Sequence, residues 1–144
     1  MSRSFHIRVP CTSANIGPGF DVVGLSLSLY LFLDVTIEAD APHMDPVLTY
    51  SGQGAADAPL NPYQNLITRV ALYVMRVNDI KSFPRGVRIH VRNDIPFGRG
   101  LGSSGAAVIA GLLLGNELGQ LHIDRDRLLA YCLLYPSPSP RDKR

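Results

Sequence analysis

The segment IPFGRGLGSSGAA, Ile95 to Ala107, is the strongest structural signal in this 144-residue chain. Its four glycines and two serines separate a strand-like segment from a long apolar run. Glycine lets the main chain approach a ligand closely and adopt positive φ angles, so successive N–H groups can converge on one point. Ser103 or Ser104 can cap the helix that follows, whose free N–H groups and positive dipole end favour phosphate. The segment therefore predicts a phosphate-binding loop between a strand and a helix.

The sequence on either side of this segment supports that arrangement. Arg85 to Arg92 alternates apolar and polar side chains, which predicts a strand with one buried face. The run from Ser103 to Leu114 is apolar on almost every side, which predicts a buried helix rather than an amphipathic one. Within this run, Gly111 and Gly115 have the GxxxG spacing, which we expect to allow close packing against a sheet or a neighbouring helix.

The N-terminal half is predicted to be mainly strand. Period-two alternation covers Phe5 to Val9, Val22 to Ala39 (one long bent strand or a pair) and Val47 to Tyr50. Between the first two segments, CTSANIGPGFD (Cys11 to Asp21) holds more turn-forming residues than a simple connection needs. Its short polar side chains could therefore face a ligand.

Two further segments have helical spacing. Tyr63 to Asn78 repeats apolar residues every three or four positions, and Asp124 to Leu134 reads as one more helix. We expect the inner face of the second helix to carry Leu128, Leu129 and Cys132. Strands followed by a helix, a strand, a loop and a helix predict an α+β fold.

Length, composition and charge exclude several classes of protein. A chain of 144 residues with 46% hydrophobic content suits a single soluble domain. A net charge of +2, with scattered Lys and Arg, predicts neither a nucleic-acid nor a membrane partner. Cys11 and Cys132 lack ligand spacing, so we expect reduced thiols and no structural zinc. With no signal-peptide-like segment at the N-terminus, these features predict a cytoplasmic protein.

The last ten residues, YPSPSPRDKR, do not continue the pattern of a folded domain. Three prolines at alternate positions, followed by charged residues, interrupt the preceding helix. Residues 1–134 are therefore expected to form the domain, and 135–144 a disordered, non-native-looking tail on a truncated chain. A natural linker is the alternative.

The glycine-rich segment allows other interpretations. Gly100, Gly102 and Gly105 form a literal GxGxxG, with Asp124 about 20 residues further on, as in a dinucleotide-binding fingerprint. The strand before it has one charged face, however, and NDIPFGR separates that strand from the first glycine of the fingerprint. A P-loop is excluded because the segment has no lysine. A plain Gly/Ser-rich turn also remains an alternative.

Two motifs resemble those of a known family. PFGRGLGSSGAA resembles the PxxxGLGSSAA phosphate-binding motif of the GHMP kinases, and SANIGPGFDVVGLSL, Ser13 to Leu27, resembles the first motif of homoserine kinases. They occur in the family's order, about 75 residues apart. The resemblance implies a GHMP kinase N-terminal domain, like ribosomal protein S5 domain 2, present here in incomplete form. It also implies that the family's ferredoxin-like C-terminal domain is absent from this chain.

The resemblance further implies where ligands bind. Ser104 would reach a Mg²⁺ ion, and Asn15 and Asp21 would bind the amino-acid substrate. ATP would contact Asn65, Pro96, Phe97, Gly98, Arg99, Gly100, Leu101, Gly102, Ser103, Ser104, Gly105 and Ala106. Asn65 could instead be a helix N-cap, Asn15 and Asp21 turn residues, and Arg99 a solvent-facing side chain. Gly105 replaces an alanine that is common in the family.

The activity implied is that of a homoserine kinase, which uses ATP to convert L-homoserine to O-phospho-L-homoserine in threonine biosynthesis. Its partners would be this small-molecule substrate and, for the full-length parent, a second copy in a homodimer. A magnesium-binding glutamate and an HPDN-like segment of the family are missing after the last helix, so we assign no catalytic residue and expect this chain alone to be inactive. The alternatives are a GHMP kinase for mevalonate or galactose, and a non-catalytic nucleotide-binding module.

Overall fold

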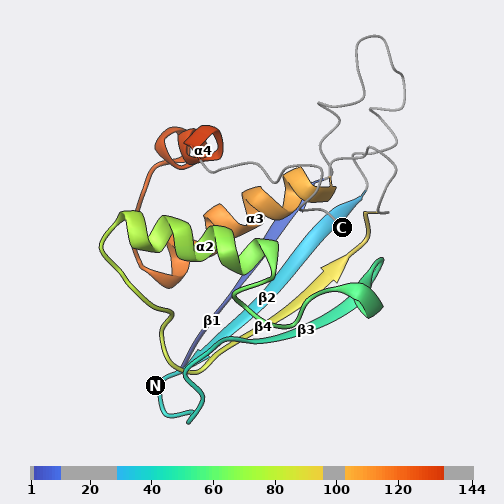
Figure 1. Ribbon diagram of the computed structural model, residues 1–144, viewed down its shortest axis with the longest axis horizontal. Helices are drawn as coiled ribbons and strands as arrows, with labels where there is room; N and C mark the ends of the chain where they lie inside the picture. The colour runs from blue at the N-terminus through green and yellow to red at the C-terminus, as the bar shows by residue number, and fades with distance from the viewer. Residues whose placement is uncertain (1, 11–28, 96–102, 135–144) are drawn as a thin grey trace.

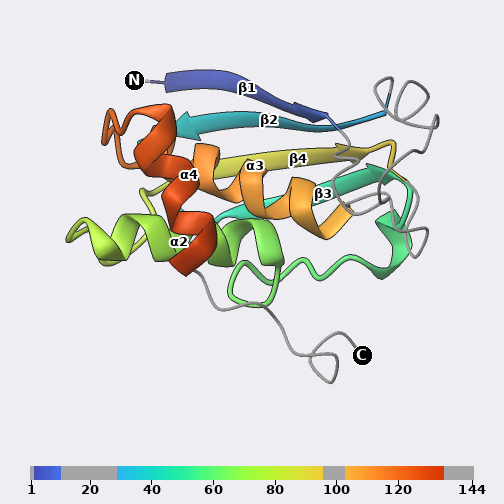
Figure 2. The same ribbon diagram turned by 90° about the horizontal axis from the view of Figure 1, so that it is seen from above.

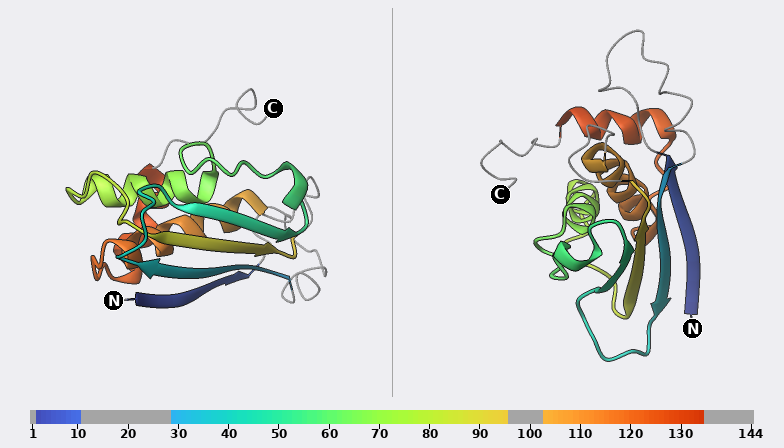
Figure 3. Two further views of the ribbon diagram at one scale, coloured as in Figure 1. Left: turned by 90° about the horizontal axis from the view of Figure 1, so that it is seen from below. Right: turned by 90° about the vertical axis from the view of Figure 1, so that its right-hand side faces the viewer.

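Four strands form one mixed sheet in the part of the chain that the structure describes. The computed structural model describes residues 2–10, 29–95 and 103–134, with side chains for residues 105–131 of the last range. The strands β1 (Ser2–Pro10), β2 (Tyr30–Glu38), β3 (Val47–Gly52) and β4 (Val87–Asn93) lie in the order β1-β2-β4-β3. β2 pairs antiparallel with β1 and β4, whereas β3 pairs parallel with β4. Figure 3 (left) shows the four strands side by side.

The alternation of the sequence places one face of β4 in the core. Val87, Ile89 and Val91 are buried, whereas Arg88 and Arg92 are exposed, as predicted. β4 begins two residues later than predicted, because Gly86 has a φ of +79° and turns the chain before the strand. A strand with one polar face, between an antiparallel and a parallel neighbour, is not the first strand of a dinucleotide-binding fold. The structure therefore excludes that alternative.

The helices lie on one face of the sheet. The described helices are a short 3-10 helix η1 (Ala55–Asp57), α2 (Leu66–Val77), α3 (Ser103–Leu118) and α4 (Arg125–Leu134). α2 and α3 cover the sheet, and α4 packs on α2 and α3 (Figures 1 and 2). No helix among the described residues is long and apolar enough to span a membrane.

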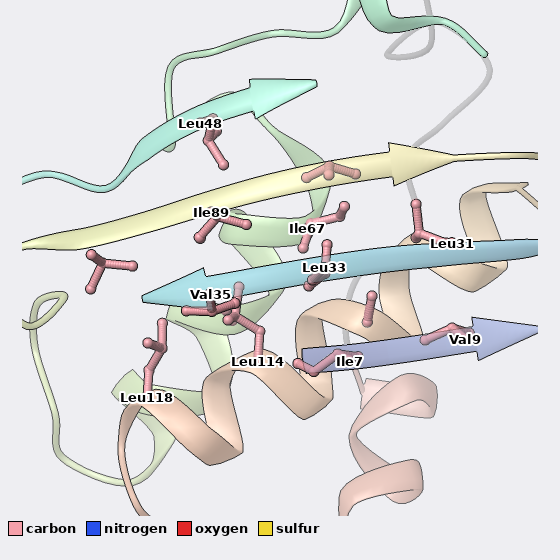
Figure 4. Packing of buried hydrophobic residues seen from close by; sticks show 14 of the residues in the cluster. Ile7, Val9, Leu31, Leu33, Val35, Leu48, Ile67, Ile89, Leu114 and Leu118 are labelled. Carbon is pink, nitrogen blue, oxygen red and sulfur yellow. The ribbon is translucent and has the colours of Figure 1, made fainter. Parts of the chain in front are cut away.

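The core fills the space between the sheet and the helices α2 and α3. Figure 4 shows side chains from every strand pointing toward the two helices, among them Ile7, Leu33 and Ile89. Leu114 and Leu118 of α3 and Ile67 of α2 complete this cluster from the other side (Figure 4). A second, smaller cluster joins the three helices through Val70, Val74, Leu112 and Leu128. α3 is therefore buried on several sides, as its composition predicted.

α2 and α3 pack together without room for side chains at two positions. A Cβ atom on Gly111 would lie 2.6 Å from the carbonyl oxygen of Ile67, and one on Gly115 would lie 2.6 Å from that of Ala71. The predicted close packing at the GxxxG spacing is confirmed, with α2 as the neighbour. Because the later glycine meets the later residue of α2, the two helices run in the same direction (Figure 1).

Three sequence-based predictions need correction or lie outside the described residues. The helix predicted from Tyr63 begins only at Leu66, because Asn65 caps it. Leu129, expected on the inner face of α4, is 43% exposed, whereas its neighbour Leu128 is buried. α4 touches the domain along a narrow strip, so only one of two adjacent leucines is covered. The segment predicted from Val22 to Ala39 contains β2, and its part before residue 29 lies outside the described residues.

Candidate functional site

The ends of several strands lie together at one end of the sheet, at the right of Figure 1. β1 ends at Pro10, which pairs with Tyr30 at the start of β2, and β3 ends at Gly52, which pairs with Asn93 at the end of β4. The N–H of Asp94 donates to the carbonyl of Tyr30 at 3.0 Å and links the two pairs. α2 and α3 both begin on this side (Figure 1). The segment 11–28, which holds the first motif, and the segment 96–102, which holds the first part of the second, therefore attach at neighbouring points.

α3 begins at Ser103, where the glycine-rich segment ends. The first N–H groups of a helix have no intrahelical acceptor, and its N-terminal end carries a partial positive charge. α2 adds a second N-terminus pointing the same way (Figure 1). Gly105 is half-buried and Ala106 is fully buried in the core, so any phosphate contact of Ala106 must come from its N–H group. This end of the molecule is suited to an anion.

Asn65 caps α2. Its side-chain oxygen accepts a hydrogen bond from the N–H of Ile67 at 3.0 Å. Its amide nitrogen donates to the hydroxyl of Tyr50 and, at 2.9 Å, to the carbonyl of Pro59. Asn65 is 2% exposed and both of its N–H groups are used within the protein. The N-cap role is confirmed, and the contact of Asn65 with ATP stays a prediction.

The hydroxyl of Tyr50 is held neutral in this network. Burial raises the pKa of Tyr50 above its usual value, and the hydrogen bond from Asn65 opposes this with a smaller effect. The phenol therefore stays protonated at neutral pH. β3, the Pro59 segment and the start of α2 are thus joined by uncharged hydrogen bonds.

Replacing Asn65 with alanine should destabilise the chain by about 1–3 kcal/mol, because the helix loses its cap and Tyr50 and Pro59 lose a buried donor. The midpoint of urea unfolding measures this loss. Asn61→Ala is the matched control: Asn61 accepts from the N–H of Tyr63 at 2.8 Å but is exposed, so we expect a change within about 0.5 kcal/mol. Equal losses in the two variants would contradict the structural role of Asn65.

Asn93 lies at this end of the sheet and was not singled out by the sequence interpretation. It ends β4, is 4% exposed, and hydrogen-bonds to main-chain atoms of Gln53 and Ile95. Ile95, the last described residue before the glycine-rich segment, is fully buried. The dipeptide Asn-Asp after a strand is a turn signal that would have drawn attention to Asn93. Its contact with Gln53, 40 residues earlier, has no such signal.

Two arginines lie near this end on the open face of the sheet. The guanidinium of Arg92 lies 4.0 Å from the ring centre of Phe32, and that of Arg8 lies 4.9 Å from that of Tyr30. Arg92 also forms a weak, exposed ion pair with Asp94 at 3.8 Å. Among the described residues, no group of three or more His, Cys, Asp or Glu side chains could hold a metal ion.

The other predicted site residues are not described. Ser103 and Ser104 form the start of α3, but their side chains lie outside the described part of the structure. The same holds for the whole of Asn15, Asp21, Pro96, Phe97, Gly98, Arg99, Gly100, Leu101 and Gly102. The structure thus locates the ends of both motif segments and leaves the individual ligand contacts as predictions.

Comparison with known proteins agrees with this geometry. The model of the GHMP kinases N terminal domain matches residues 65–136, which is half of the chain. The homoserine kinase of Saccharomyces cerevisiae is 54% identical over 142 residues, covering 93% of this chain and 40% of that protein. The homoserine kinase of Candida albicans is 56% identical over 136 residues, covering 91% of this chain and 37% of that protein.

A solved structure shares the fold. The crystal structure of homoserine kinase from Cytophaga hutchinsonii matches with a TM-score of 0.62 and 22% identity, covering 91% of this chain and 40% of that one. The chain thus spans about two fifths of the length of the relatives it matches. The match of the GHMP kinases N terminal domain to half of the chain shows that the chain belongs to the GHMP kinase family.

Proposed function

We propose that this chain provides the ATP-binding part of a homoserine kinase, which transfers the terminal phosphoryl group of ATP to the hydroxyl of L-homoserine. The observation that carries the proposal is the 54% identity to the Saccharomyces cerevisiae homoserine kinase over nearly the whole chain. The start of α3 at Ser103, directly after the glycines of the motif, supports an anion-binding role for this end.

In this proposal the main chain from Gly100 to Ala106 wraps the ATP phosphates. A Mg²⁺ ion would neutralise phosphate charge, and the hydroxyl of Ser104 would be one of its ligands. Asn15 and Asp21 would bind the ammonium and hydroxyl groups of homoserine. Catalysis would then rest on positioning and charge neutralisation.

One feature fits a cellular setting, and two alternative functions stay open. Two cysteines without ligand spacing fit the reducing cytoplasm, in which we place the enzyme. A homodimer of the full-length parent stays a prediction. The same fold could serve another GHMP kinase with a different alcohol acceptor, or a nucleotide-binding module without activity.

A chimaera tests the proposal. Residues 1–134 of this chain replace the aligned segment of the Saccharomyces cerevisiae homoserine kinase, and a coupled assay follows MgATP consumption with L-homoserine, mevalonate or galactose. We expect turnover with L-homoserine. Asn15→Ala or Asp21→Ala should raise KM for homoserine while leaving KM for ATP unchanged. A folded chimaera that consumes ATP with none of the three acceptors would favour the inactive module.

The same chimaera tests Ser104. Ser104→Ala should lower kcat/KM for MgATP about tenfold or more, because a ligand of the metal is lost. Ser82→Ala removes the hydroxyl of an exposed serine in the loop before β4 and serves as the control, with activity unchanged. Equal activity of the two variants would remove Ser104 from the proposed site.

A further inference from the structure

We propose that Asn93 is a positioning residue, whose buried amide fixes the point at which the chain leaves the sheet and enters the glycine-rich segment 96–102. The inference rests on the proposed function only in assigning the ATP phosphates to that segment.

The side chain of Asn93 uses all three of its polar groups on main-chain partners. Its oxygen accepts from the N–H of Ile95 at 3.0 Å. Its nitrogen donates to the carbonyl of Ile95 at 3.1 Å and to the carbonyl of Gln53 at 3.2 Å. Asn93 thus holds both main-chain groups of Ile95, the residue from which the segment continues, and ties them to the end of β3.

The main chain around Asn93 is held equally closely. The N–H of Gln53 donates to the carbonyl of Asn93 at 2.7 Å, so the two residues are joined in both directions. Gly52 makes this approach possible: its φ is +86°, and a Cβ atom there would lie 2.3 Å from the carbonyl oxygen of Asn93. The buried side chain of Ile95 then anchors the other end of the contact in the core.

The contact needs an amide. Two carbonyl oxygens face the nitrogen of Asn93 and one N–H faces its oxygen, so both donors and an acceptor are required. Aspartate has the same shape but would present oxygen to both carbonyls in a buried place, which is strongly unfavourable. Serine could still accept from the N–H of Ile95 but could not reach both carbonyls. Asn93→Asp should therefore disturb this contact more than Asn93→Ser does.

Asn116 offers a matched control within the same chain. Its oxygen accepts from the N–H of Ile123 at 3.0 Å and its nitrogen donates to the carbonyl of Ile123 at 3.3 Å, which is the same clamp on a following isoleucine. It lies in the last turn of α3, whereas the glycine-rich segment joins the first turn. Asn116→Asp should therefore break a similar set of hydrogen bonds without affecting the glycine-rich segment 96–102.

The experiment measures amide hydrogen exchange in the 144-residue chain for Asn93→Asp, Asn93→Ser and Asn116→Asp, each at a temperature chosen to give equal global stability. We expect exchange at residues 95–102 to be about tenfold faster in Asn93→Asp, with Asn93→Ser between it and the wild type. Asn116→Asp should change exchange at Ile123 and leave residues 95–102 unaltered. If Asn93→Asp does not fold, Asn93→Ser carries the comparison.

Calorimetric titration with inorganic tripolyphosphate and Mg²⁺ gives the second readout. The affinity of the chain for tripolyphosphate should fall about tenfold in Asn93→Asp and change by less than about twofold in Asn116→Asp. Equal acceleration of exchange at 95–102 in the two aspartate variants would overturn the positioning role, and so would unchanged affinity in Asn93→Asp. A wild-type chain that binds no tripolyphosphate would contradict the proposed function, while the exchange comparison would still decide the role of Asn93.

Discussion

Replacing Gly86 with alanine should remove about 3–5 kcal/mol from the free energy of unfolding. A Cβ atom there would lie 1.8 Å from the carbonyl oxygen of Glu38, and the φ of +79° is unfavourable for any residue with a side chain. The main chain cannot easily move away. The N–H of Gly86 donates to the carbonyl oxygen of His43 at 3.1 Å, and the carbonyl oxygen of Gly86 accepts from the N–H of Glu38 at 3.0 Å. A domain of this size has only about 5–15 kcal/mol of stability, so much of it would be lost.

Guanidinium unfolding of the wild type and the variant measures this effect. Gly54→Ala is the control, because Gly54 has a similar φ of 73° in the loop before η1 and tests mainly the backbone conformation. The Gly54→Ala variant should lose about 1–2 kcal/mol of its free energy of unfolding. If the two variants lost the same stability, the close approach of Gly86 to Glu38 would carry no cost of its own.

Gly111→Ala should cost about 2–4 kcal/mol, although alanine favours helix over glycine by about 1 kcal/mol. The new methyl group would lie 2.6 Å from both the carbonyl oxygen of Ile67 and the Cβ atom of Val70, neither of which is the flexible end of a side chain. α2 and α3 would have to separate, and the buried residues on both sides would lose contact. The midpoint of thermal unfolding, with far-ultraviolet circular dichroism to follow helix content, measures the loss.

Gly119→Ala is the control for a glycine whose nearest neighbours are movable side chains, because Gly119 directly follows α3 and does not lie inside it. A Cβ atom on Gly119 would come within 2.9 Å of Cδ1 of Ile80 and 3.0 Å of Cγ of Leu121, both of which belong to side chains that can move. We expect a change within about 1 kcal/mol. A Gly111→Ala variant at least as stable as the wild type would mean that propensity outweighs the helix contact.

Local patterns predicted much of the fold. The alternation in Arg85 to Arg92 identified β4 and its buried face, and the serines after the glycine-rich segment marked the start of α3. GxxxG spacing predicted close packing but not its partner, because only the tertiary structure brings Gly111 against Ile67. The wrong orientation of Leu129 has the same origin, since how much of a helix face is covered depends on its neighbours.

The site could be predicted only in part. The glycine-rich segment could be singled out because phosphate binding needs a local arrangement of glycines, serines and a helix start. The structure confirms the helix start, and the phosphate contacts stay a prediction. The hydrogen bond from Asn93 to Gln53 joins residues 40 apart, and it exists only because β3 pairs with β4. Asn65 was singled out by resemblance, but its bond to Tyr50, 15 residues earlier, could not be read from the sequence.

The common direction of α2 and α3 has an electrostatic consequence. Two helices that lie side by side and point the same way have parallel dipoles, and parallel dipoles repel each other. The close packing of Gly111 and Gly115 against α2 holds the pair in place against that repulsion, and an anion at the N-terminus of α3 would relieve part of it. Because such an anion binds the folded chain and not the unfolded one, it would favour folding by mass action. The ligand would then act as a component of the fold's stability as well as a reactant.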